Sequence, residues 1–174
     1  MTSIGEESEG RTKRPVQVEV EARGKEKGMS GYAIDIVIVE DNPADAELLM
    51  RVFKKHNVAN KITVLKDGAE AIDFFFSPES AKARTVRPMV VILDLKLPKV
   101  NGIEVLRRLK SDEQTRRLPV VVLTSSREER DLEDSYSSGV NSYVTKPIKF
   151  EEFAKVVSEL EMYWLLINKS PVVE

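Results

Sequence analysis

The chain has 174 residues, of which 27 are Lys or Arg and 29 are Asp or Glu, and its formal net charge is -2 at neutral pH. Nearly balanced charge creates no overall field that would attract nucleic acid or an anionic membrane, so a basic nucleic-acid-binding protein is disfavoured. There is no cysteine, which excludes disulfides, thiolate metal sites and a cysteine nucleophile. No apolar run approaches the roughly 18 residues of a membrane span, and no signal peptide is present, so we expect a cytoplasmic protein.

Residues 1–32 are rich in Gly, Glu, Lys, Arg and Ser and carry few large apolar side chains. Such a segment cannot bury enough apolar surface to offset the entropy of ordering it, and we predict a disordered tail. Val16, Val18 and Val20 do alternate with polar residues, as in an edge strand, but nothing nearby in the sequence offers a pairing partner. We expect one folded domain over residues 33–168 and a short tail at 169–174.

Along the folded part, stretches typical of buried strands alternate with stretches typical of amphipathic helices. The strands are predicted at 34–39, 61–66, 89–93, 118–123 and 141–145. The helices are predicted at 43–57, 68–76, 102–112, 127–138 and 150–167. Strict alternation requires right-handed crossovers and a parallel sheet covered by helices on both faces. The sequence therefore predicts an α/β fold with a doubly wound, five-stranded parallel sheet.

Acidic residues follow two of the predicted strands at the point where each strand ends. Glu40 and Asp41 follow the first strand, and Asp94 follows the third. The carboxyl ends of parallel strands meet at one edge of the sheet, so these three side chains should converge. Carboxylates about 4 Å apart repel each other by about 4 kcal/mol per pair at an effective dielectric constant near 20, which calls for a proton or a cation. An all-oxygen donor set favours Mg²⁺ or a similar hard divalent ion.

Two further polar side chains should reach the same edge, Thr124 after the fourth strand and Lys146 after the fifth. A carboxylate beside Mg²⁺ can either serve only as a ligand or attack a phosphoryl group and become an acyl phosphate. For the second role, the cation, the Lys146 ammonium and the Thr124 hydroxyl would stabilise the transferring oxygens. Taken singly, Lys146 could be a surface lysine and Thr124 a helix cap. Their joint arrival at one edge favours phosphoryl transfer.

At these motifs the sequence resembles the receiver domains of response regulators of the chemotaxis-regulator type. The resemblance covers about residues 34–167. It rests on Val-Glu-Asp-Asn-Pro-Ala-Asp at 39–45, Leu-Asp-Leu-Lys-Leu-Pro at 93–98 with Gly102, Val-Leu-Thr-Ser-Ser at 122–126 and Tyr-Val-Thr-Lys-Pro at 143–147. It implies the flavodoxin-like strand order 2-1-3-4-5. Since the fold should end near residue 167, we expect a single-domain regulator whose output comes from its own surface.

The resemblance implies a role for each matched residue near the phosphoryl group. Asp94 would accept the group from a phosphohistidine on a sensor kinase, and Thr124 and Lys146 would bind its oxygens. Tyr143 would be the switch aromatic, acting together with Thr124. The bond between Lys146 and Pro147 would be the family's cis peptide, since an X–Pro bond has little trans preference.

The resemblance also implies the ligands of the Mg²⁺ ion. Asp41, Asp94 and the backbone carbonyl of Lys96 would bind it, and Glu40 would act through a water molecule. Lys96 and Ser126 depart from the family's common pattern, at two positions that tend to set the lifetime of the phosphoryl group. The residues of these motifs, together with Trp164, are most similar to those of single-domain regulators that partner phytochrome-type kinases.

The last predicted helix carries more apolar surface than a helix buried on one side requires. A core stripe is predicted at Phe150, Phe153, Val157, Leu160 and Trp164. The C-terminal turns are apolar almost all round, and a partner surface is predicted at Tyr163, Trp164, Leu165 and Leu166. Together with the 127–138 helix and the strand near Tyr143, this end should pack on a partner protein or on a second copy in a homodimer.

A hydrolase and a pseudo-receiver are two other functions that would require different residues at the site. A hydrolase working through an aspartyl phosphate would need an acid two residues after Asp94, where Lys96 stands. A pseudo-receiver, acting as a docking module without phosphorylation, would lack Asp94, Thr124 or Lys146, and all three are present. We therefore expect a signalling phosphoacceptor rather than an enzyme, with the pseudo-receiver as the alternative.

Overall fold

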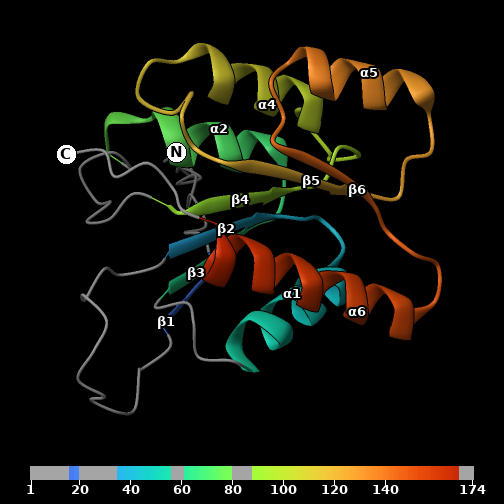
Figure 1. Cartoon of the computed structure of the whole chain (residues 1–174). Helices are drawn as coiled ribbons and strands as arrows, with labels where there is room; N and C mark the ends of the chain where they lie inside the picture. Colours follow the sequence, from blue (N-terminus) through green and yellow to red (C-terminus); the bar gives the residue numbers. More distant parts are fainter. Residues whose placement is uncertain (1–15, 20–34, 56–60, 80–87, 169–174) are drawn as a thin grey trace, which may run out of the picture.

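The computed structural model describes residues 16–19, 35–55, 61–79 and 88–168, and its centre is a twisted sheet between two layers of helices (Figure 1). Five parallel strands lie in the spatial order β3-β2-β4-β5-β6. They are β2 (Asp35–Val39), β3 (Lys61–Leu65), β4 (Val90–Leu93), β5 (Val120–Thr124) and β6 (Ser142–Thr145). The predicted five-stranded parallel sheet and its 2-1-3-4-5 order are confirmed.

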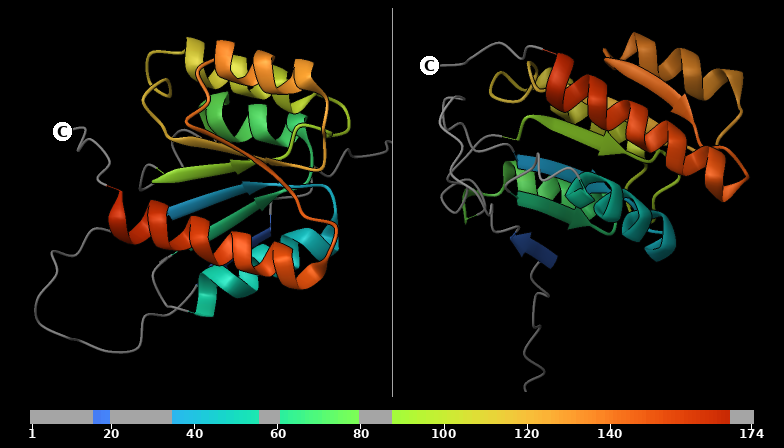
Figure 2. Two further views of the ribbon diagram at one scale, coloured as in Figure 1. Left: turned by 45° about the vertical axis from the view of Figure 1, so that its right-hand side comes forward. Right: turned by 60° about the horizontal axis from the view of Figure 1, so that its bottom comes forward.

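A sixth strand, β1 (Val16–Glu19), pairs antiparallel with β3 at the edge of the sheet, with Val16 opposite Val64 and Glu19 opposite Lys61 (Figure 2). The prediction of a wholly disordered tail over residues 1–32 is therefore wrong for these four residues. The pairing partner is distant in the sequence, so local pattern could not reveal it, and an open sheet edge readily accepts such a strand. The other residues of 1–32, and the predicted tail at 169–174, lie outside the described residues.

The helices cover both faces of the sheet (Figure 1). One face carries α1 (Pro43–Lys55) and α6 (Phe150–Glu161). The other carries α2 (Gly68–Phe76), α4 (Gly102–Ser111) and α5 (Glu129–Ser137). The apolar run of β2 is explained by burial on both faces of the sheet. Ile36 and Ile38 pack into the core under α1 and α6, while Val37 and Val39 pack into the core on the opposite face. A strand buried on both faces needs apolar side chains at every position.

Local signals at the helix ends agree with the predicted boundaries to within a few residues. The Asn42 side chain accepts hydrogen bonds from the Ala44 and Asp45 N–H groups and so caps α1. Gly139, with φ of 86°, follows α5 in the left-handed region that favours glycine. No helix among the described residues is both long and apolar enough to cross a lipid bilayer.

The last predicted helix differs from its expected form. α6 ends at Glu161 and continues as a π-helix, η1 (Met162–Ile167). Trp164 and Leu165 are buried, only 7 % and 6 % exposed, whereas Tyr163 and Leu166 are exposed. The wider π turn brings two consecutive side chains to the core, so placing Trp164 and Leu165 on the partner surface was wrong. Phe150, the first residue of α6, was predicted in the core stripe but is also exposed.

Candidate functional site

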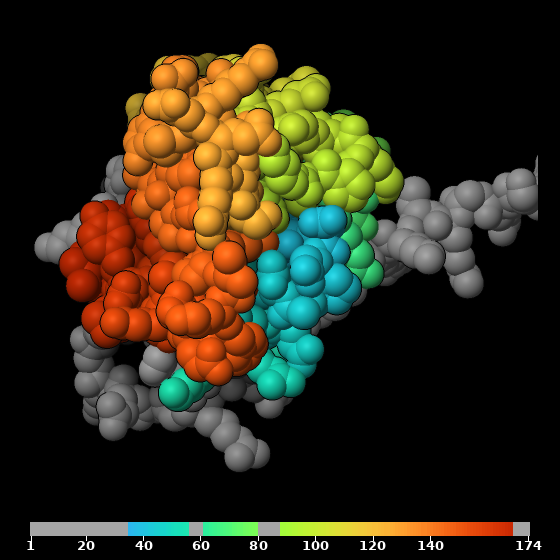
Figure 3. Space-filling view, turned by 90° about the vertical axis from the view of Figure 1, so that its right-hand side faces the viewer, coloured from blue at the N-terminus to red at the C-terminus, as the bar shows by residue number. Residues whose placement is uncertain are grey.

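The carboxyl ends of the parallel strands meet at one edge of the sheet, and Figure 3 faces this side of the molecule. The start of α1 (cyan), the segment after β4 (yellow-green) and the segments around β5 and β6 (orange) adjoin one another on this surface. These segments are far apart in the sequence. The fold therefore brings together the segments that carry the residues predicted to bind the metal ion and the phosphoryl group.

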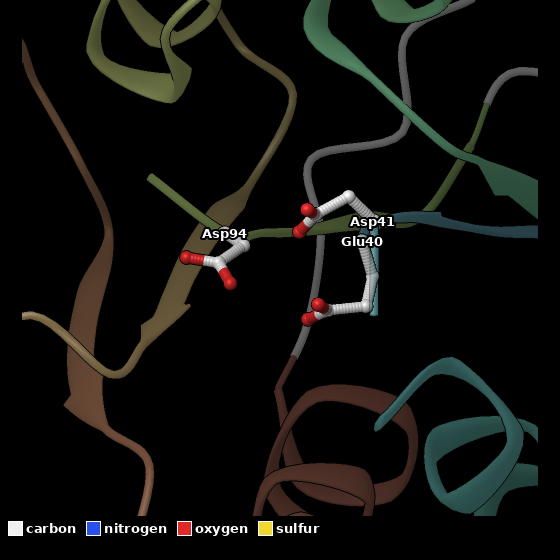
Figure 4. Close-up of side chains that lie close together, drawn as sticks. All are labelled: Glu40, Asp41 and Asp94. Carbon is white, nitrogen blue, oxygen red and sulfur yellow. The ribbon is translucent and has the colours of Figure 1, made fainter. Parts of the chain in front are cut away.

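The three predicted acidic residues do converge, and Figure 4 shows their side chains close together. Strand register explains the approach: Val39 of β2 is opposite Leu93 of β4, so the next residues, Glu40 and Asp94, lie side by side. The Asp94 N–H donates to the Val39 carbonyl at 3.0 Å and fixes this register beyond the last strand pair. One carboxylate oxygen from each of Glu40, Asp41 and Asp94 lies within 4.8 Å of the others.

Lys146, which directly follows β6, also reaches this cluster. Its N–H donates to the Thr124 carbonyl at 2.8 Å, which continues the pairing of β6 with β5. Its buried ammonium lies 2.5 Å from Glu40 Oε2 and 2.9 Å from Asp94 Oδ2. A third carboxylate, Asp45 Oδ2, lies 2.9 Å from the same nitrogen. No sequence pattern singled out Asp45, because an acid in the first turn of a helix is common.

The charges of the cluster shift the pKa values of two of its members. Burial raises the pKa of Glu40 to about 7, even though the Lys146 cation opposes this shift. Burial alone would lower the pKa of Lys146, but its ion pairs with Glu40 and Asp94 outweigh burial and hold that pKa above its ordinary value. Lys146 therefore stays protonated. The acids outnumber it, and the excess negative charge is relieved either by a proton on Glu40 or by a bound cation.

The raised pKa of Glu40 predicts a pH dependence of stability in EDTA. Between the ordinary value near 4.5 and the folded value of about 7, the folded protein binds more protons than the unfolded chain, so stability falls as pH rises through this window. We expect the Glu40 contribution to the free energy of unfolding to drop by about 2 to 3 kcal/mol between pH 5 and pH 7.5. Urea unfolding at both pH values measures it. Glu40→Gln should remove most of the difference; an equal slope in this variant would contradict the assignment.

The donor set fits a hard divalent cation. Glu40, Asp41 and Asp94 offer only oxygen atoms, and Asp41 is exposed, so one side of the cluster is open to solvent. The Lys96 N–H donates to Asp94 Oδ1 at 3.1 Å and holds the segment after β4 against the cluster. The backbone carbonyl of Lys96 as a further ligand stays a prediction.

Thr124 and Tyr143 occupy the α5 side of the edge. Thr124 is fully buried, and its Oγ1 accepts a hydrogen bond from the Ser126 N–H at 3.3 Å. Tyr143 is half-buried, and its hydroxyl makes a long hydrogen bond of 3.5 Å to the Ser126 carbonyl. Ser126 thus contacts both residues of the predicted switch pair. The switch itself stays a prediction.

Lys96, one of the two unusual residues beside the site, forms ion pairs with the start of α5. Its ammonium lies 3.0 Å from Glu128 Oε1 and 3.0 Å from Asp131 Oδ2. The Ser126 hydroxyl also donates to Asp131. Hydrogen bonds from Ser126 and Lys96 hold the pKa of Asp131 below its ordinary value. The two unusual residues, Lys96 and Ser126, therefore share one carboxylate, which links the segment after β4 to α5.

The bond between Lys146 and Pro147 is trans, so the expected cis peptide is wrong in this structure. Because an X–Pro bond favours trans by only about 0.5 to 1 kcal/mol, the sequence is compatible with either isomer, and the tertiary context decides.

The chain is similar in sequence to known signalling proteins. The family model for the response regulator receiver domain matches residues 36–158. A probable methanogenesis regulatory protein, FilR2 of Methanothrix harundinacea, is 46 % identical over 136 residues, covering 78 % of this chain and 86 % of FilR2. The response regulator Rcp1 of a Synechocystis species is 38 % identical over 130 residues, covering 75 % of this chain and 88 % of Rcp1.

Solved structures of two such regulators share the fold. The Mn²⁺-bound form of Rcp1 matches with a TM-score of 0.75 at 36 % identity, covering 80 % of this chain and 99 % of that one. The phosphorylated cyanobacterial phytochrome response regulator RcpA matches with a TM-score of 0.76 at 37 % identity, covering 81 % of this chain and 100 % of that one. One relative has thus been crystallised with a divalent cation and another with a phosphoryl group.

Proposed function

The chain belongs to the response regulator receiver domain family, and from this premise we propose that Asp94 accepts the phosphoryl group in a two-component phosphorelay. The single observation that supports this role is the position of the Asp94 carboxylate. One of its oxygens lies within 4.8 Å of oxygens of Glu40 and Asp41, and its Oδ2 lies 2.9 Å from the Lys146 ammonium. A nucleophilic carboxylate with a cation site and a buried lysine beside it is what phosphoryl transfer requires.

In the proposed reaction a carboxylate oxygen of Asp94 forms a bond to the phosphorus atom of a phosphohistidine on a sensor kinase. The bond between phosphorus and the imidazole nitrogen breaks, and that nitrogen keeps the electron pair and takes a proton from solvent. Lys146 and Thr124 donate hydrogen bonds to the phosphoryl oxygens. Glu40, Asp41 and Asp94 would hold Mg²⁺, which when bound supplies positive charge at those oxygens.

The proposed partner that donates the phosphoryl group is a kinase. A sensor histidine kinase follows from the family, and the similarity to RcpA supports a phytochrome-type kinase in particular. The family's role is signalling, and we propose no reaction for this chain other than the gain and loss of the phosphoryl group on Asp94.

The exposed Tyr163 and Leu166, beside the exposed Ile167, support an association surface at the end of η1. Sedimentation with and without beryllofluoride tests it; an unchanged monomer in both would contradict self-association.

Incubation with acetyl phosphate tests the proposed function directly. With Mg²⁺, we expect intact-mass measurement to show a gain of one phosphoryl group, because the cation neutralises the acidic cluster as the donor approaches. With EDTA, we expect the rate to fall by at least about a hundredfold, since the approaching phosphoryl oxygens would then face uncompensated carboxylates. No gain under either condition would favour the pseudo-receiver alternative. An equal gain in EDTA would contradict the metal site.

A further inference from the structure

The Lys146 ammonium has as many acceptors as it has donors. An ammonium group carries three N–H donors and no acceptor. Glu40 Oε2, Asp45 Oδ2 and Asp94 Oδ2 lie 2.5, 2.9 and 2.9 Å from its nitrogen. Each donor therefore has one carboxylate partner. To donate to a phosphoryl oxygen, Lys146 must give up one of these three.

Two of the three acceptors have another duty during the reaction. Asp94 is the reacting carboxylate, and it also belongs to the cation cluster. Glu40 belongs to that cluster too, with an oxygen within 4.8 Å of those of Asp41 and Asp94. A divalent cation competes with Lys146 for both of these carboxylates. The contacts that now hold the ammonium beside Asp94 are thus weakened when the site is loaded.

Asp45 has neither duty. It lies in the first turn of α1, outside the cluster of three acids, and its side chain is 27 % exposed. Together with Lys146 it lines an open cavity of about 390 Å³, to whose lining Asp41 does not belong. Because α1 is capped at Asn42 and packs against the sheet, Asp45 offers a carboxylate on a rigid element.

We propose that Asp45 is a positioning residue for phosphoryl transfer, whose carboxylate holds the Lys146 ammonium beside Asp94 while the cation and the phosphoryl group occupy Glu40 and Asp94. This inference rests on the proposed function and deepens it. When the site is loaded, one N–H of Lys146 turns to the phosphoryl group and another stays on Asp45. Removing Asp45 leaves a long, flexible lysine chain without its fixed partner.

A plainer role for Asp45 is that of an acid at a helix start, which stabilises α1 through the positive end of the helix dipole. That role would not depend on Lys146. The two roles therefore differ in whether the effect of changing Asp45 requires Lys146, which a double-mutant cycle measures.

The experiment compares wild type, Asp45→Asn, Lys146→Gln and the double variant, with acetyl phosphate as donor and Mg²⁺ at saturation. Asp45→Asn should lower the phosphorylation rate and the affinity for beryllofluoride by about tenfold, the effect expected for one hydrogen bond between charged groups. In the Lys146→Gln background, the same change should alter either quantity by less than about twofold. Glu47→Gln, which removes an exposed carboxylate two residues further along α1, is the matched control and should change neither.

A second readout does not depend on reactivity. In wild type with Mg²⁺ and beryllofluoride, the Lys146 ammonium should exchange its protons slowly enough to give an NMR signal, and Asp45→Asn should lose that signal. An unchanged or raised rate in Asp45→Asn would overturn the proposal, as would an equal loss in both backgrounds. If wild type itself takes up no phosphoryl group, the proposed function fails instead, and the ammonium signal still reports whether Asp45 holds Lys146.

Discussion

Asp94→Asn is expected to abolish phosphorylation while leaving the protein folded. The amide that replaces the carboxylate is not a nucleophile, so the rate with acetyl phosphate and Mg²⁺ should fall by at least about a thousandfold. The fold should survive because an amide oxygen can still accept the hydrogen bond from the Lys96 N–H, and Lys146 keeps Glu40 and Asp45 as partners. Intact mass measures the first outcome and urea unfolding the second.

The stability of this variant is informative as well. The acids of the cluster outnumber the single buried lysine, so removing one charge lowers like-charge repulsion. We expect the free energy of unfolding in EDTA to stay equal to that of wild type or to rise. Asp73→Asn, which changes an exposed acid on α2, is the control for the assay. A phosphoryl group retained by Asp94→Asn would show that another side chain accepts it, and would contradict the assignment.

Gly102→Ala is expected to damage the fold and the site together. A Cβ atom at Gly102 would lie 2.2 Å from the Asp94 carbonyl oxygen and 2.6 Å from Leu95 Cα, distances that only a backbone shift can relieve. The Gly102 N–H also donates to the Leu95 carbonyl at 2.9 Å, so the start of α4 is fastened to the segment that follows Asp94. We expect a loss of about 3 kcal/mol in the free energy of unfolding, in the range of severe core substitutions.

A weaker Mg²⁺ affinity should accompany this loss, because the shifted segment carries Asp94 and Lys96. Calorimetric titration of the folded variant measures it. Glu104→Ala, at an exposed position of the same helix, should change the free energy of unfolding by less than about 0.5 kcal/mol. A fully stable Gly102→Ala would mean that the segment after β4 adjusts freely, and the tight approach of α4 would then have no role in placing Asp94.

Much of the fold was predictable because local pattern and global architecture agree. The apolar runs of β2 and β4 need burial on both faces, and only a parallel sheet covered by helices provides it. The same logic places Glu40, Asp41, Asp94 and Lys146 at one edge, since each follows directly on a parallel strand. The sequence thus predicted which residues meet, without predicting a single distance.

Three features depended on contacts that no local pattern carries. β1 was missed because its partner β3 follows only after a long intervening segment. The π-helix at the end of α6 turned Leu165 inward beside Trp164, whereas a regular helical period places only Trp164 in the core stripe. Lys146–Pro147 is trans, although the family resemblance implied cis.

By itself, then, the sequence determined the parallel five-stranded sheet, the composition of the acidic cluster and its charge excess, because these follow from periodicity and from which residues end each strand. The strand order followed from the resemblance to the family. The tertiary structure alone decided how the charges are partnered. It placed Asp45 on Lys146, and it placed Lys96 on Asp131. Such pairings depend on the angle at which helices lie on the sheet and on the reach of each side chain, and packing sets both after the chain has folded.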